Sequence, residues 1–291
     1  MFDKILVAID FSDPSVEALD WTRDRYPDAE ITLFHALERT DPPGYVQRAL
    51  EDAVDVGKEE ELDARTNLEA LAEARGLEGR TIVREGWPPR AVHEAAAETG
   101  ADLLVVAAHR RQVWPGDEPP GATAEAIAER SSVPVLIWRD QVEPTTDHPT
   151  VVASLDLREG TEPVSRAAAE VARTFGARLV LMHVLSGTLH SYLRAVSSPP
   201  KVEESMRSIQ RSAREEAESR VPEELRDELE VQTVIQRGRQ VTQILATAET
   251  EAADLIVMGK SHAARPDAGL LGSVTGKVVR GASCSVLIVP L

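Results

Sequence analysis

A loop near the C-terminal end of the chain combines residue types that bind phosphate groups. It spans residues 259–275 and follows a run of apolar residues. Gly259 would let the backbone leave a strand sharply and approach a ligand closely, because glycine has no Cβ. Gly272 and Ser273 stand where the next helix is expected to begin. Serine is a good N-cap, and the free N–H groups of a helix N-terminus favour phosphate oxygens. The pattern predicts an anion site in this loop.

The local charge agrees with an anion site. Residues 259–281 contain four cations and one anion, a net charge of +3 in a chain whose formal net charge is −17: Lys260, Arg265, Lys277 and Arg280 against Asp267. An ordinary N-cap with a few solvated basic side chains is the alternative that the residue types alone leave open. The strands and helices on either side of residues 259–275 decide between an anion site and an ordinary N-cap.

These elements belong to an internal repeat. Segments recur in the same order at offsets between 146 and 152 residues: 6–10 and 152–156, 33–35 and 181–183, 101–106 and 253–258, 135–137 and 286–288. Chance does not readily produce such an ordered set, and a duplication does. We expect two domains, residues 1–140 and 149–291, joined by a linker near residues 141–149.

Each copy is expected to be a five-stranded α/β domain. In the second copy, apolar runs of strand length alternate with helical patterns over 164–175 and 241–248 and with a solvated helix over 203–220. The runs are 151–155, 179–184, 231–235, 254–258 and 285–289. Apolar strands that alternate with helices indicate a parallel sheet covered on both faces. The predicted fold is two tandem doubly wound domains of flavodoxin-like or Rossmann-like type, and ligands of such sheets bind beyond the carboxyl ends of the strands.

At this point the sequence resembles a known family. The order of elements, the segment Ala-Asp-Leu-Ile-Val-Met-Gly at 253–259 and the segment Gly-Ser-Val-Thr at 272–275 resemble the universal stress protein family. The resemblance covers the whole chain, once per copy. The ATP-binding branch of that family carries Gly-x2-Gly-x9-Gly-Ser/Thr, and the second copy matches it with Gly259, Gly272 and Ser273. His262 stands at the second glycine.

The resemblance implies ATP or another adenine nucleotide as the ligand, with Mg²⁺ as an optional companion. Asp156 would lie near the adenine or ribose, and Val184, just after the second strand of the copy, would line the base pocket. The phosphates and ribose would be held by Gly259, Ser261, Gly272, Ser273 and Val274. His262 either crowds the triphosphate or donates a hydrogen bond to it, and a slip of one residue would place Ala263 there instead.

The first copy departs further from the motif. Its residues at the motif positions are Ala107, Arg110 and Ala122. Asp117 and Glu118 fall where phosphates would lie, although Asp10 matches Asp156. We expect the first copy to be a partner that does not bind nucleotide, with Trp114 as a candidate plug of its pocket.

Other chemically active side chains have structural interpretations. His35 and His183 end equivalent apolar strands, where a hydrogen-bonded core histidine is the stronger expectation. Cys284 is expected to be a small buried hydrophobe. The sequence contains no metal-ligand spacing and no Gly-x-Ser-x-Gly elbow.

Composition narrows the function. The acidic charge argues against nucleic acid as a partner. No apolar run reaches the roughly 18 residues of a membrane span, and a strand pattern starts at Ile5, so a soluble, cytoplasmic protein is expected. The leading hypothesis is a stress-response regulatory protein that binds ATP through the second copy and is not an enzyme, although slow ATP hydrolysis is compatible with it.

Two other hypotheses compete with ATP binding. One is an ATP-independent scaffold in which both nucleotide sites have decayed. The other is an enzyme of the wider adenine-nucleotide-binding α/β group, such as an adenylating or nucleotidyl-transferring enzyme, whose usual Ser-Gly-Gly and His-x-Gly-His signatures are absent. The strands at 134–138 and 285–289 are expected to lie near each other in an intramolecular pseudo-dimer. Both are too apolar to be left exposed at the edge of a sheet. A homodimer of chains and an unknown protein partner remain open.

Overall fold

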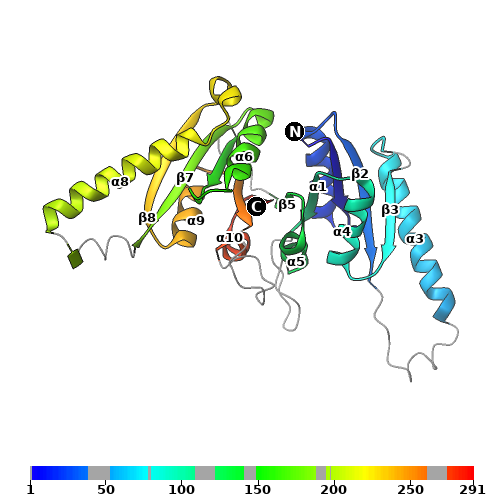
Figure 1. Ribbon diagram of the computed structural model, residues 1–291. Helices are drawn as coiled ribbons and strands as arrows, with labels where there is room; N and C mark the ends of the chain where they lie inside the picture. Colours follow the sequence, from blue (N-terminus) through cyan, green and yellow to red (C-terminus); the bar gives the residue numbers. More distant parts are fainter. Residues whose placement is uncertain are drawn as a thin grey trace. The chain divides into compact units, whose positions relative to one another are not determined.

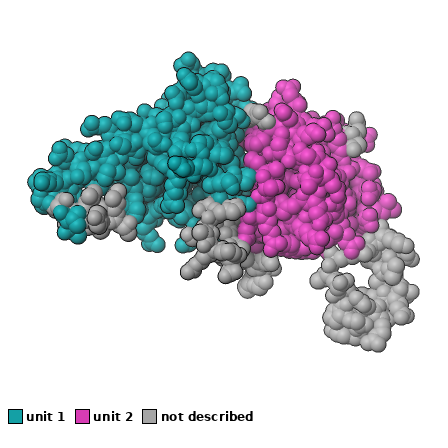
Figure 2. All heavy atoms as spheres, in the orientation of Figure 1, with its two compact units in different colours: residues 1, 136–291 teal, residues 2–135 magenta. Residues whose placement is uncertain are grey.

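The computed structural model describes residues 2–38, 53–77, 80–108, 122–140, 149–187, 195–196, 198–260 and 274–291. These residues form two compact units (Figure 2), an N-terminal unit of Phe2–Val135 and a C-terminal unit of Leu136–Leu291. In each unit, strands and helices alternate along the chain (Figure 1).

The N-terminal unit is built on parallel strands in the order β3-β2-β1-β4. Its strands are β1 (Lys4–Ala8), β2 (Glu30–Leu37), β3 (Thr81–Glu85) and β4 (Leu103–Ala107). Its helices are α1 (Asp13–Arg25), α3 (Ala53–Glu73), α4 (Pro88–Thr99) and α5 (Ala122–Arg130). β5 (Val135–Trp138) begins at the last residue of this unit.

The C-terminal unit has five parallel strands in the order β10-β9-β6-β7-β8. They are β6 (Thr150–Ser154), β7 (Arg178–Ser186), β8 (Val231–Gly238), β9 (Leu255–Lys260) and β10 (Ser285–Pro290). Its helices are α6 (Glu162–Phe175), α8 (Pro199–Ser219), the 3-10 helix η1 (Glu223–Glu228), α9 (Gln240–Thr250) and α10 (Thr275–Gly281). With right-handed crossovers, the reversal of strand order puts α6 and α8 on one face and α9 and α10 on the other. The predicted α/β fold class is confirmed.

The strand register repeats from one unit to the other. Ile5 of β1 pairs with Leu103 of β4, and Val151 of β6 pairs with Leu255 of β9. These are the positions that the sequence repeat aligns. The duplication inferred from short sequence matches is therefore also a duplication of strand pairing.

An aspartate before each fourth strand fixes that register. Asp102 accepts a hydrogen bond from the backbone N–H of Lys4 at 3.1 Å, and Asp254 accepts one from the backbone N–H of Thr150 at 2.7 Å. In both units the carboxylate satisfies the N–H that opens the first strand, a group that the sheet leaves unpaired. The repeated Ala-Asp-Leu sequence thus has a structural role.

The interior of the C-terminal unit is apolar. β6, β9 and β10 are largely buried along their length, and Cys284 just before β10 is 4 % exposed, as expected. Burial raises the pKa of the Cys284 thiol to about 12. The long helix α8 is attached to the sheet by Val202 and Met206, which pack with Leu185 of β7. Helix position in this unit is thus set by side-chain packing.

The C-terminal unit starts within β5. The backbone N–H of Arg139, which follows β5, donates to Ser285 Oγ at 3.1 Å, and its Nη2 donates to the carbonyl oxygen of Val279 at 2.7 Å. The expected linker lies outside the described residues except at its final residue, Pro149. The domain bounds 1–140 and 149–291 and the pairing of the two copies stay predictions.

Candidate functional site

The strand order of the C-terminal unit reverses between β6 and β9. These strands are direct neighbours, with Ser154 opposite Met258. Asp156, with an exposed side chain, follows the end of β6, and Gly259 follows Met258. Ligands of open parallel sheets bind beyond the strand ends at such a reversal. The structure therefore brings Asp156 and Gly259 to the same edge of the sheet, as the sequence predicted.

Gly259 itself has a different local role from the one expected. The strand does not end there, because β9 continues through Lys260 and Gly259 pairs with Val289 of β10. A Cβ at position 259 would lie 3.1 Å from Val164 Cγ2 and 3.0 Å from Leu291 Cδ1. Glycine avoids crowding here, because α6 and Leu291 pack closely against the strand and would have to shift slightly to admit a side chain. The prediction of a sharp backbone exit at Gly259 is wrong.

The two ends of the candidate phosphate loop are tied together. Thr275, the first residue of α10, donates from Oγ1 to the carbonyl oxygen of Gly259 at 3.1 Å. Val274 takes the N-cap position with α-helical dihedral angles, so α10 begins later than the Ser273 N-cap predicted from sequence. Thr275 uses its hydroxyl to join the helix to the strand. The loop residues Ser261, His262, Gly272 and Ser273 lie outside the described residues.

Val184 lies within a strand. It was expected just after the second strand of the copy, but β7 continues to Ser186 because β8 pairs with it as far as Gly238. Val184 is 7 % exposed. Side chains alternate between the two faces of a strand, so Val184 faces away from Leu185 and from the cluster under α8. Its expected place after the strand is corrected, and its contact with a base stays a prediction.

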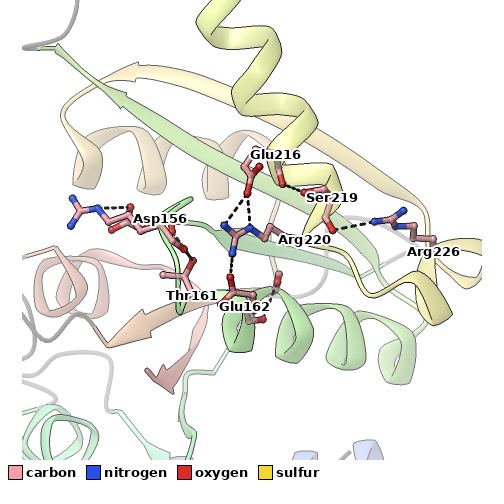
Figure 3. A network of polar contacts seen from close by, with 9 residues as sticks. Asp156, Thr161, Glu162, Glu216, Ser219, Arg220 and Arg226 are labelled. Carbon is pink, nitrogen blue, oxygen red and sulfur yellow. Dashed lines mark hydrogen bonds and ion pairs between the residues drawn. The ribbon is translucent and has the colours of Figure 1, made fainter.

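A short loop after β6 carries Asp156 and closes on itself (Figure 3). The hydroxyl of Thr161 lies 2.7 Å from the backbone oxygen of Asp156 and 2.8 Å from that of Arg158. Gly160 has a φ of +81°, which a residue with a side chain rarely adopts. The Asp156 carboxylate also forms an ion pair with Arg158 Nε at 3.3 Å, with both side chains largely exposed. The loop is thus ordered by its own contacts and presents Asp156 to solvent.

His35 and His183 lie inside β2 and β7 rather than at the strand ends where they were expected, and they have equivalent structural contacts. His183 Nδ1 lies 2.8 Å from the carbonyl oxygen of Leu155, and His35 Nδ1 lies 2.7 Å from the carbonyl oxygen of Ile9. Both side chains are half-buried. These contacts join the second strand of each unit to the residue after its first strand. The prediction of hydrogen-bonded structural histidines is confirmed.

The N-terminal unit has a cavity at the equivalent edge, where a pocket plugged by Trp114 was expected. Its volume is about 410 Å³, and Asp10, His35, Glu38 and the start of α5 contribute to its lining. Asp10 accepts hydrogen bonds from the backbone N–H of Ser12 at 3.0 Å and from its hydroxyl at 2.5 Å. The loop 109–121, with Arg110, Trp114, Asp117 and Glu118, lies outside the described residues. Loss of the motif glycines gave no signal for this cavity, because apolar side chains from several distant segments form its walls.

The described residues limit the chemistry that this part of the chain can perform. Among them, no group of three His, Cys, Asp or Glu side chains could hold a metal ion. No helix in the described part of the chain is long and apolar enough to cross a membrane. At the carboxyl ends of the strands in the C-terminal unit, Asp156 has carboxylate oxygens that can accept hydrogen bonds. Lys260, the last residue of β9, is a buried cation.

Comparisons with known proteins agree with one another. The model of the Universal stress protein family matches residues 1–139 and again residues 149–290. The Universal stress protein YxiE of Bacillus subtilis is 29% identical over 149 residues, which cover 48% of this chain and 100% of that protein.

Two solved structures share the fold over the whole chain. A universal stress protein from Archaeoglobus fulgidus superposes with a TM-score of 0.66 at 20% identity, covering 99% of this chain and 96% of that one. A putative universal stress protein from Pseudomonas aeruginosa gives a TM-score of 0.58 at 18% identity, with 99% and 93% covered. At these identities the likeness is one of fold.

Proposed function

Because the chain belongs to the universal stress protein family and carries two family domains in tandem, we propose that it is a regulatory protein that binds an adenine nucleotide, with ATP as the first candidate. The proposed site is the carboxyl edge of the C-terminal sheet. Asp156 would meet the adenosine part, and the loop between Gly259 and Val274 would meet the phosphates.

One observation carries the proposal. The strands that end near Asp156 and Gly259 are neighbours at the reversal of strand order, where such sheets bind ligands. The Thr275 hydroxyl bonded to Gly259 supports it by closing the base of the intervening loop. The loop between these two ends has a net charge of +1, from Lys260 and Arg265 against Asp267, and Lys277 and Arg280 of α10 raise the total to +3. This positive charge is suited to a polyphosphate.

Regulation is favoured over catalysis. A general base must stand within hydrogen-bond reach of the proton that it removes. In the described residues of this edge, His183 Nδ1 donates to the carbonyl oxygen of Leu155, which leaves Nε2 as its basic nitrogen, and the Asp156 carboxylate is paired with Arg158. Neither contact by itself places a base against a nucleotide, so regulation is the role that we propose first. If Mg²⁺ accompanies the nucleotide, the exposed Asp156 carboxylate would be available to it or to its bound water.

The test compares the same position in the two copies, Asp156 and Asp10. Purified full-length protein is denatured and its adenine nucleotide content measured, and nucleotide-free protein is titrated with ATP by calorimetry. We expect one ATP per chain. Asp156→Ala should weaken binding about tenfold or more, the effect of losing a hydrogen bond to a charged group, and Asp10→Ala should leave affinity within about twofold of wild type.

Two other results would redirect the proposal. Two equivalent sites, or loss of binding only in Asp10→Ala, would move the site to the N-terminal unit and its cavity. No binding of ATP, ADP or AMP would instead favour an ATP-independent scaffold. Asp10→Ala is a suitable control because Asp10 follows the equivalent strand, β1, and accepts hydrogen bonds from the backbone N–H and the hydroxyl of Ser12.

A further inference from the structure

One arginine ties the end of α8 to the start of α6. Arg220 follows α8 and donates from Nη1 to Glu162, the first residue of α6 (Figure 3). It also approaches Glu216 Oε1 with Nε at 2.9 Å and Nη2 at 2.8 Å. The Arg220 side chain is only 13 % exposed, against 58 % for Glu162. A planar guanidinium held by two carboxylates fixes the distance between the two helices.

The end of α8 is itself firmly held. Arg226 donates from Nε to the carbonyl oxygen of Val221 and from Nη2 to that of Ser219, both at 3.1 Å. The Ser219 hydroxyl donates to the backbone oxygen of Glu216 at 2.8 Å. These bonds satisfy carbonyl groups that the end of a helix leaves without intrahelical partners. Arg220 therefore projects from a well-anchored backbone.

Glu162 adjoins the loop after β6, so a contact that fixes Glu162 also restrains this loop. Its own backbone N–H, the charge and hydrogen bond of Arg220, and the N–H of Gly160 together hold the pKa of the Glu162 carboxyl below its usual value. Thr161, between Gly160 and Glu162, donates to the backbone oxygen of Asp156. Arg220 thus holds Glu162, and the neighbouring Thr161 holds the backbone of Asp156.

We infer that Arg220 is a positioning residue for the Asp156 side of the proposed nucleotide site and acts through Glu162 and the loop 156–161. The inference rests on the proposed function. A loop that is already ordered loses less conformational entropy when a ligand binds, so affinity is higher. Arg220 supplies part of that order without touching the ligand.

The experiment compares two ion pairs that join α6 to the segment after α8, one through Arg220 and one through Glu224 of η1. Arg220→Ala and Glu162→Gln remove the first pair. Arg166→Ala removes the matched pair between Arg166 of α6 and Glu224 of η1, which measures 2.9 Å and has side chains 57 % and 61 % exposed. The dissociation constant for ATP is measured by calorimetry on the full chain. We expect Arg220→Ala to weaken ATP binding about threefold to fivefold, Glu162→Gln about twofold, and Arg166→Ala less than that.

A second measurement needs no nucleotide. Amide hydrogen exchange of residues 156–161 should be faster in Arg220→Ala and Glu162→Gln than in wild type, and unchanged in Arg166→Ala. If Arg220→Ala and Arg166→Ala change affinity and exchange equally, the Arg220–Glu162 pair contributes only to the general stability of the unit, and the inference is overturned. Unchanged exchange in Glu162→Gln and Arg220→Ala would overturn it as well. If wild-type protein does not bind ATP, the proposed function fails, and hydrogen exchange alone decides whether Arg220 orders the loop.

Discussion

The imidazole of His183 is held against the backbone of Leu155, with Nδ1 2.8 Å from the carbonyl oxygen. A carbonyl oxygen only accepts hydrogen bonds, so the neutral ring must carry its proton on Nδ1. The same argument applies to His35 and Ile9 in the other unit. His35 and His183, which are 148 residues apart in the sequence, therefore share one tautomer.

This tautomer can be observed directly. Long-range ¹H–¹⁵N spectra of the full chain above the pKa of free histidine, about 6.5, should show Nδ1 protonated and Nε2 unprotonated in both His35 and His183. Replacing His183 with Ala should lower the free energy of unfolding by about 1 kcal/mol through loss of one hydrogen bond. The Nε2-protonated form in either residue would contradict the assignment.

Gly259→Ala should destabilise the C-terminal unit even though the backbone there is an ordinary strand. The new Cβ would approach Val164 Cγ2 to 3.1 Å, and Val164 is buried at 2 % exposure, so it has little room to move. We expect a loss of about 1–3 kcal/mol, typical of overpacking. The double variant Gly259→Ala/Val164→Ala should lose less than the sum of the two single variants in urea unfolding. Strict additivity would show that the two side chains do not clash.

The Glu162 contact should depend on pH in a defined direction. The pKa of this carboxyl lies below its usual value of 4.5, through its own backbone amide, Arg220 and Gly160. A carboxylate with a lowered pKa contributes stability above the unfolded-state value, and that contribution is lost as pH falls through the folded-state pKa. The difference in unfolding free energy between wild type and Glu162→Gln should therefore be constant above about pH 5 and shrink below it. A difference that grows on acidification would contradict this assignment.

His262 stands where the family motif has its second glycine, and its structure is not described. We expect His262→Gly to tighten ATP binding, because glycine at this position lets the backbone approach the ligand. If the imidazole instead donates to a phosphate, affinity of the wild type should rise on going from about pH 8 to about pH 6, and His262→Gly should abolish that rise. Calorimetry of both proteins at the two pH values separates the outcomes. Identical affinity throughout would mean that the side chain points away from the site.

The order of elements could be predicted from the sequence because it depends on local pattern. Apolar runs and helical spacing placed β6, α6 and β9 within one or two residues of where they lie. The recurrence of 101–106 at 253–258 predicted the duplication, and the pairing register follows it. The proximity of Asp156 and Gly259 also followed from sequence, because parallel strands of one sheet end at one edge.

What the sequence did not determine depends on contacts between segments distant along the chain. Gly259 was predicted to let the backbone leave the strand sharply, but its lack of a Cβ matters because Val164 and Leu291 pack closely against it. The lengths of β7 and β9 are decided by their pairing with β8 and β10. Arg220 gave no signal among the many arginines of this chain, because its role requires α8 to end beside Glu162, 58 residues away. Local pattern specified the elements, whereas packing between them decided which side chains order the candidate site.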